Sequence, residues 1–123
     1  MDVLIVDDEK PVLRCLAVCV LKLGHNVRQA TSYNEAVLEI EKKAPDLIIS
    51  DYHMKGKSGA ELLAFTLSME NPIPFSVISG FLSNEEIEFI EKETYGFIPK
   101  PFTVTDIKEI LDKVEIKNES SSS

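Results

Sequence analysis

Three acidic side chains of this sequence directly follow short apolar segments. Asp7 and Asp8 come after residues 3–6, and Asp51 comes after residues 47–50. Two carboxylates held about 4 Å apart repel each other by roughly 4 kcal/mol at an effective dielectric constant near 20. A hard divalent cation relieves that repulsion, and Mg²⁺ characteristically takes carboxylate, water and phosphate oxygens. The three acids therefore predict a magnesium site if the fold brings them together.

A hydroxyl group and a lysine follow two further apolar segments. Ser79 comes directly after residues 75–78, and Lys100 follows residues 96–98 after Pro99. Lys100 offers a positive charge to an anion bound beside the metal, and Ser79 offers the same anion a hydroxyl donor. Aspartate carboxylates are nucleophiles that can form acyl phosphates. Each residue alone has an ordinary explanation in a turn or on the surface, but the combination predicts phosphoryl chemistry.

Alternating strands and helices must position these groups. Strands are expected at residues 3–6, 26–30, 47–50, 75–78 and 96–98. A helical segment follows each strand, and two of the helices open with the capping motifs "SYNE" at 32–35 and "SNEE" at 83–86. Alternation of this kind predicts an α/β fold: a flavodoxin-like parallel sheet of five strands in the order 2-1-3-4-5, with helices on both faces.

In such a sheet the ligand crevice lies beyond the carboxyl ends of the strands, where the strand order reverses. The first and third strands of the predicted sheet flank that point. The acids that follow these two strands, together with Ser79 and Lys100, are therefore expected to converge on one crevice.

Composition and charge restrict the classes of function. The chain has 123 residues, of which 21 are acidic and 13 are Lys or Arg, giving a net charge of −8. This balance argues against a nucleic-acid partner, because affinity for phosphate backbones comes largely from lysine and arginine. No apolar run approaches the roughly 20 residues that span a bilayer, and no basic leader is visible. We therefore expect a cytoplasmic protein that contacts neither a membrane nor nucleic acid directly.

One domain is expected at this length, spanning residues 1–116. Residues 117–123, "KNESSSS", contain no apolar side chain and are expected to form a disordered polar tail. Cys15 and Cys19 lie four residues apart in the first helical segment, with no further metal ligands nearby. We expect them to be buried or partly buried free thiols.

The residues at the strand ends resemble those of the receiver domains of two-component response regulators. The resemblance covers residues 2–116 and includes the loop patterns "DYHM…SG" and "FIPKPF". The matching positions are Asp7, Asp8, Asp51, Ser79 and Lys100-Pro101. This resemblance implies a phosphorylation-dependent signalling module rather than a metabolic enzyme.

For the acceptor site, the resemblance implies that Asp51 takes a phosphoryl group from a histidine kinase's phosphohistidine or from a small acyl phosphate. Asp7, Asp8 and Asp51 would hold Mg²⁺ together with the backbone carbonyl of His53. Lys100 would pair with Asp51 and afterwards with the phosphoryl oxygens. The implied partners are a sensor histidine kinase or phosphotransfer protein, and a downstream effector protein or fused output domain.

For the switch, the resemblance implies that Ser79 moves inward to hydrogen-bond the phosphoryl group and that the ring of Phe97 follows it. The surface that changes would be formed by the last two helices and the fifth strand. The Lys100–Pro101 peptide bond would be cis, as it is in similar domains.

Three loop positions depart from the commonest pattern of the family. Lys55 stands where proline is frequent, which favours a more mobile loop. His53 and Phe81 occupy positions that influence the access of water in similar domains. A large apolar Phe81 would shield the acyl phosphate, whereas a misplaced His53 would activate water against it, and the balance favours a slowly decaying phosphate.

Other functions fit the same groups less well. A pseudo-receiver would act by protein contact without phosphate, but the site residues are all present. A small Mg²⁺-dependent phosphotransferase or phosphatase usually has a second acid two residues after the nucleophile, where this chain has His53. A flavin-binding protein of this topology would need a phosphate-cradling loop after the first strand, and acids stand there instead.

Overall fold

The computed structural model describes the backbone of residues 1–122 and the side chains of residues 1–117. Within this part of the chain, five strands alternate with five helices. In chain order they are β1 (Asp2–Val6), α1 (Lys10–Lys22), β2 (Asn26–Ala30), α2 (Tyr33–Lys42), β3 (Leu47–Asp51), α3 (Gly59–Leu67), β4 (Phe75–Ser79), α4 (Asn84–Glu93), β5 (Phe97–Pro99) and α5 (Val104–Ser122).

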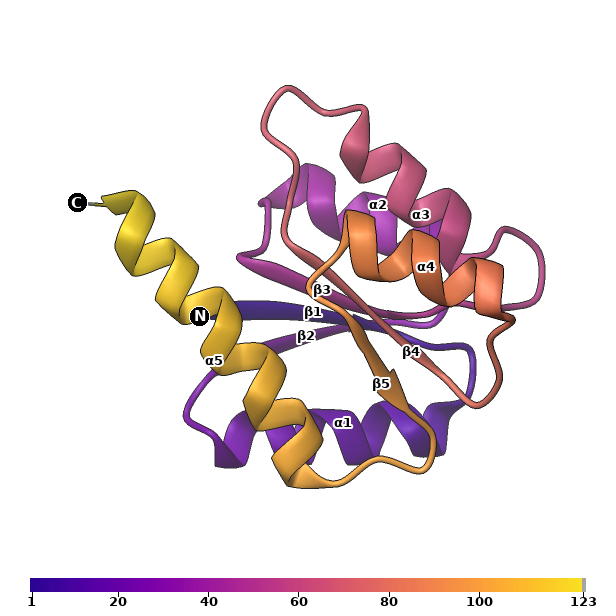
Figure 1. The fold of residues 1–123 in the computed structure, drawn as a ribbon, viewed down its shortest axis with the longest axis horizontal. Helices are drawn as coiled ribbons and strands as arrows, with labels where there is room; N and C mark the ends of the chain where they lie inside the picture. Colours follow the sequence, from indigo (N-terminus) through magenta and orange to yellow (C-terminus); the bar gives the residue numbers. More distant parts are fainter. Residues whose placement is uncertain (123) are drawn as a thin grey trace.

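The five strands form one parallel sheet in the order β2-β1-β3-β4-β5. Helices α1 and α5 cover one face of this sheet, and α2, α3 and α4 cover the other (Figure 1). The predicted fold class and strand order are therefore confirmed. Because β1 and β3 are adjacent, the strand order reverses between their carboxyl ends, where a crevice is expected.

The central strands are apolar at nearly every position because both of their faces are buried. In β1, Val3 and Ile5 pack with α1 and α5, whereas Leu4 and Val6 pack with the helices of the other face. All four side chains have no exposed surface. Continuous apolar runs of this kind are typical of parallel sheets covered on both sides.

Serine caps fix where several of the helices begin. Ser83 accepts a hydrogen bond from the N–H of Glu86, whose carboxylate in turn accepts the N–H of Ser83, so the predicted capping box of α4 is complete. The predicted box of α2 forms only in part. Ser32 accepts the N–H of Glu35, but the Glu35 carboxylate binds the N–H and hydroxyl of Thr31 instead.

Two expectations differ from the structure. Helix α5 continues to Ser122, whereas residues 117–123 were expected to be a disordered tail; Ser123 lies outside the described residues. The apolar periodicity marks where packing ends, at the buried Val114, and not where the helix ends. The domain boundary at residue 116 stays a prediction.

The second difference concerns the cysteines, which are expected to be buried or partly buried. Cys15 is exposed because it lies beside the buried stripe of α1, whereas Cys19 is partly buried as expected.

Among the described residues, no helix combines the length and apolar character that crossing a bilayer requires.

Candidate functional site

Four carboxylates gather at the carboxyl ends of β1 and β3. Asp7 and Asp51 are buried, Asp8 is partly exposed, and Glu9 is exposed. One carboxylate oxygen from each of these residues lies within 4.8 Å of the others. The structure therefore brings together the three predicted metal-binding acids and adds Glu9, which is not among the predicted ligands.

The ammonium group of Lys100 lies among these carboxylates. Its Nζ atom is 3.0 Å from Asp7 Oδ2, 3.1 Å from Asp51 Oδ2 and 3.5 Å from Glu9 Oε1. Burial acts to lower the pKa of Lys100, but the adjacent carboxylates of Asp7 and Asp51 outweigh it and raise that pKa above its ordinary value. Lys100 therefore remains cationic at neutral pH.

The carboxylate of Asp7 is fully buried. Burial raises its pKa above the ordinary value, and the nearby charge of Asp51 adds to this, against opposing contributions from the N–H of Glu9 and from Lys100. Asp7 Oδ2 contacts the Lys100 ammonium as an ion pair, but the geometry gives this oxygen no hydrogen bond from the described residues. A buried oxygen with unused acceptor capacity, in a set of hard oxygen donors, fits a divalent cation such as Mg²⁺.

Backbone N–H groups orient the three predicted ligands. Each of these carboxylates accepts one such hydrogen bond, which leaves its remaining lone pairs available. The donors are Glu9 to Asp7 at 2.9 Å, His53 to Asp51 at 3.2 Å and Lys55 to Asp8 at 3.0 Å.

The imidazole of His53 takes no part in this cluster. Its Nε2 lies 3.5 Å from Glu86 Oε2 at the start of α4. Glu86 therefore contacts both the loop after Asp51 and the capping box of α4, a link that the sequence motif alone did not reveal. The backbone carbonyl of His53 as a metal ligand stays a prediction.

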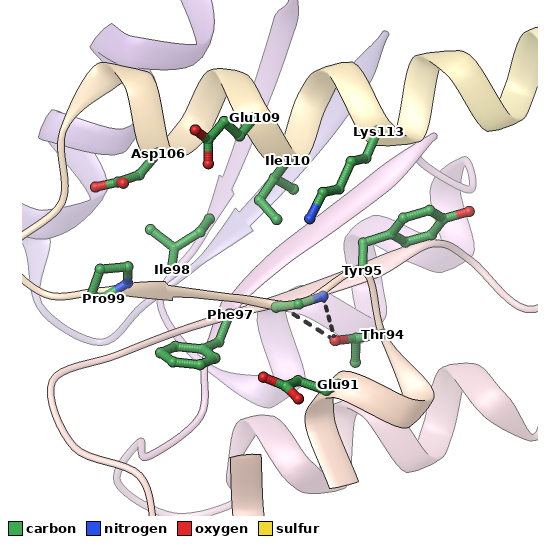
Figure 2. A pocket seen from close by; sticks show the side chains of 11 residues that line it. Glu91, Thr94, Tyr95, Phe97, Ile98, Pro99, Asp106, Glu109, Ile110 and Lys113 are labelled. Carbon is green, nitrogen blue, oxygen red and sulfur yellow. Dashed lines mark hydrogen bonds between the residues drawn. The ribbon is translucent and has the colours of Figure 1, made fainter. Parts of the chain in front are cut away.

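Within the described part of the chain, neither of the two predicted switch residues, Ser79 and Phe97, forms a hydrogen bond to the carboxylates of the cluster. The hydroxyl of Ser79 donates to the carbonyl of Phe81 at 2.9 Å and so is held by its own loop. Phe97 is partly buried, on the α4 side of β5, opposite Ile98 (Figure 2). Phe81 is 78% exposed. The predicted slow decay of a phosphate stays a prediction.

The first residue of α3, Gly59, lies very close to the end of β3. A Cβ atom at this position would lie 2.0 Å from the backbone oxygen of Asp51. The substitution Gly59→Ala is therefore expected to lower the free energy of unfolding by about 2 kcal/mol or more, because the backbone must shift. Urea denaturation measures this change.

Gly80→Ala is the matched control for that substitution. A Cβ atom at Gly80 would have its nearest neighbour, Lys100 Cβ, at 3.8 Å, which is ordinary contact. We expect a change within about 0.5 kcal/mol for this variant. Equal losses in the two variants would contradict the steric explanation.

Comparison with known proteins places this geometry in a family. The family model described as "Response regulator receiver domain" matches residues 3–112. The chemotaxis protein CheY-3 of Vibrio cholerae is 32% identical over 118 residues, covering 93% of this chain and 91% of that protein.

The chain belongs to the response regulator receiver domain family.

Other relatives agree with this assignment. The phosphate regulon transcriptional regulatory protein PhoB of Pseudomonas aeruginosa is 31% identical over 108 residues, which cover 85% of this chain and 47% of that protein. The solved receiver domain of NtrX from Brucella abortus superposes with a TM-score of 0.84 at 28% identity, covering 92% of this chain and 97% of that one. Receiver domains are signalling modules and not metabolic enzymes. In this receiver domain the Lys100–Pro101 peptide bond is cis, as the resemblance implies.

Proposed function

We propose that this receiver domain accepts a phosphoryl group on Asp51 in a Mg²⁺-dependent reaction and thereby switches a protein-binding surface. The observation that carries the proposal is the position of Asp51 at the end of β3, with the Lys100 ammonium 3.1 Å from Oδ2 and further carboxylates beside it. A nucleophile, a neutralising cation and hard oxygen donors are the parts that phosphoryl transfer to a carboxylate needs.

In the proposed reaction a carboxylate oxygen of Asp51 attacks the phosphorus of the donor, and the bond from phosphorus to the leaving group breaks. The leaving group is a histidine nitrogen of a sensor kinase or phosphotransfer protein, or the carboxylate of a small acyl phosphate. Lys100 neutralises charge on the transferred group. Asp7, Asp8, Asp51 and the carbonyl of His53 would hold Mg²⁺, which would supply further neutralisation of negative charge at the site.

The proposed output surface is the groove between α4, β5 and α5. It has a volume of about 370 Å³, and Phe97 lines it together with the charged residues Glu91, Asp106, Glu109 and Lys113 (Figure 2). Ser79 is held by its own loop, and a phosphoryl group on Asp51 would offer its hydroxyl a stronger acceptor. Movement of Ser79 and then of Phe97 would change the wall of the groove that a downstream effector or fused output domain contacts. We place this reaction in the cytoplasm.

Acetyl phosphate tests the proposed acceptor directly. Incubation with Mg²⁺ should add one phosphoryl mass to the wild-type chain in intact-mass spectrometry, and chelation of Mg²⁺ should prevent it. Asp51→Asn should reduce the adduct to background, because the nucleophilic oxygen is removed. Asp112→Asn, on α5, is the control and should keep the adduct. An adduct that survives in Asp51→Asn would contradict the assignment, and no adduct in the wild type would favour a pseudo-receiver.

A further inference from the structure

One of the three hydrogen bonds that orient the acidic cluster differs from the other two. Glu9 and His53 donate to acids only two positions before them in the chain. The N–H of Lys55 reaches Asp8 across 47 positions of sequence, from the β3–α3 loop to the loop after β1. The orientation of Asp8 therefore depends on the path of a second loop.

The path of that second loop is fixed at both sides of the donor. Gly56, the next residue, has a φ of +75°, which favours glycine. Gly59 packs against the backbone oxygen of Asp51 and donates its N–H to the carbonyl of Tyr52 at 3.0 Å. These features constrain the backbone on both sides of the Lys55 N–H, and neither involves the Lys55 side chain.

Lys55 also lines an open cavity of about 470 Å³ beside the carboxylates, together with Asp8, Glu9, His53 and Met54. The Lys55 side chain is exposed, and its ammonium forms no ion pair with any residue whose side chain is described. Its backbone and its side chain can therefore be tested separately.

We propose that the backbone N–H of Lys55 is a positioning group for the metal ligand Asp8. The N–H binds Oδ2 of Asp8, which leaves Oδ1 free for a cation or for its bound water. Hydrogen-bond donors of this kind fix the orientation of a ligating carboxylate and so raise the affinity for the metal. The β3–α3 loop, which carries the residues that follow the phosphoacceptor, thereby sets how well the cluster binds Mg²⁺. This inference rests on the proposed magnesium site.

The substitution Lys55→Pro removes the N–H, because proline has no backbone donor. We expect the dissociation constant for Mg²⁺ to rise about tenfold, the lower end of the range for such outer contacts. Mg²⁺ titration followed by amide chemical shifts measures it without any phosphorylation. Lys55→Ala keeps the N–H and removes a positive charge, so it should bind Mg²⁺ at least as tightly as the wild type.

A general distortion of the loop by proline must be separated from the loss of the donor. In an Asp8→Ala background, Lys55→Pro should have no further effect on Mg²⁺ affinity if the N–H acts through Asp8. Hydrogen exchange gives a second measure: the Lys55 amide should be protected in the metal-free wild type and exchange faster in Asp8→Ala.

Three results would overturn the inference while leaving the proposed function intact. The first is that Lys55→Pro binds Mg²⁺ with the affinity of the wild type. The second is that Lys55→Pro lowers the Mg²⁺ affinity as much in the Asp8→Ala background as in the wild type. The third is that the Lys55 amide exchanges at the same rate with and without the Asp8 carboxylate. Absence of Mg²⁺ binding by the wild type itself would instead overturn the proposed metal site and the inference together.

Discussion

Lys100→Met is expected to slow the phosphorylation of Asp51 by acetyl phosphate by about 100-fold or more. The loss of one preorganised charge at a reacting centre typically costs a factor of about 10² to 10³ in rate. In this receiver domain that charge is 3.1 Å from Asp51 Oδ2. Time-resolved intact-mass measurements at saturating Mg²⁺ give the rate. A rate within a few-fold of the wild type would show that Lys100 does not act on the transferred group.

The same substitution is expected to destabilise the metal-free fold. It leaves the buried carboxylates of Asp7 and Asp51 without their shared cation, and breaking a buried ion pair costs about 3–5 kcal/mol. We expect the free energy of unfolding to fall by about 3 kcal/mol, at the low end of this range. The loss is limited because Asp7 can take up a proton and because the Lys100 side chain is 19% exposed. Lys108→Met is the control: its partner Asp112 lies on the surface, and the loss should be small. Lys100→Arg keeps the positive charge, so it should retain more of the stability than Lys100→Met. Its phosphorylation rate then tests the position of the charged group separately from folding.

Asp7→Asn is expected to stabilise the metal-free domain and to abolish its response to Mg²⁺. Because burial raises the pKa of Asp7, the ionised form is unfavourable in the fold, and a neutral side chain of the same shape should add about 1 kcal/mol. Mg²⁺ at ten times its dissociation constant should stabilise the wild type by about 1.4 kcal/mol and the variant hardly at all. Urea unfolding with Mg²⁺ or with a chelator measures both effects.

The difference in stability between Asp7→Asn and the wild type should depend on pH, because the pKa of Asp7 is raised in the fold. An acid whose pKa is raised in the fold holds its proton more tightly in the folded state than in the unfolded state. Its contribution therefore makes stability rise as the pH falls from neutral through the raised value. The advantage of Asp7→Asn over the wild type should shrink over that same range, because protonated Asp7 is already neutral. A constant difference would show that Asp7 does not titrate there.

The fold was predictable because its signals are local. The apolar run of β1 shows that both faces of the strand are buried, and the SNEE motif marks the start of α4. Parallel strands then place their carboxyl ends at one edge, which is why the amino-acid sequence alone predicts that Asp7, Asp51 and Lys100 lie together.

The details of the site depend on the paths of loops, which have no comparable signal in the sequence. Glu9 joins the cluster because the loop after β1 turns its carboxylate toward Lys100. In the sequence, this is indicated only by the position of Glu9 directly after Asp8. The contact between His53 and Glu86 links segments far apart in sequence. The hydroxyl of Ser79 binds its own loop, and no residue pattern distinguishes that orientation from an inward one.

The central claim is that Asp51, and no other member of the acidic cluster, carries the phosphoryl group. Borohydride reduces an aspartyl phosphate to homoserine, and peptide mass spectrometry then identifies the residue that has changed. After incubation with acetyl phosphate and Mg²⁺, homoserine is expected at position 51 alone. Homoserine at position 7 or 8, or phosphate retained on the His53 imidazole, would contradict this account of the site.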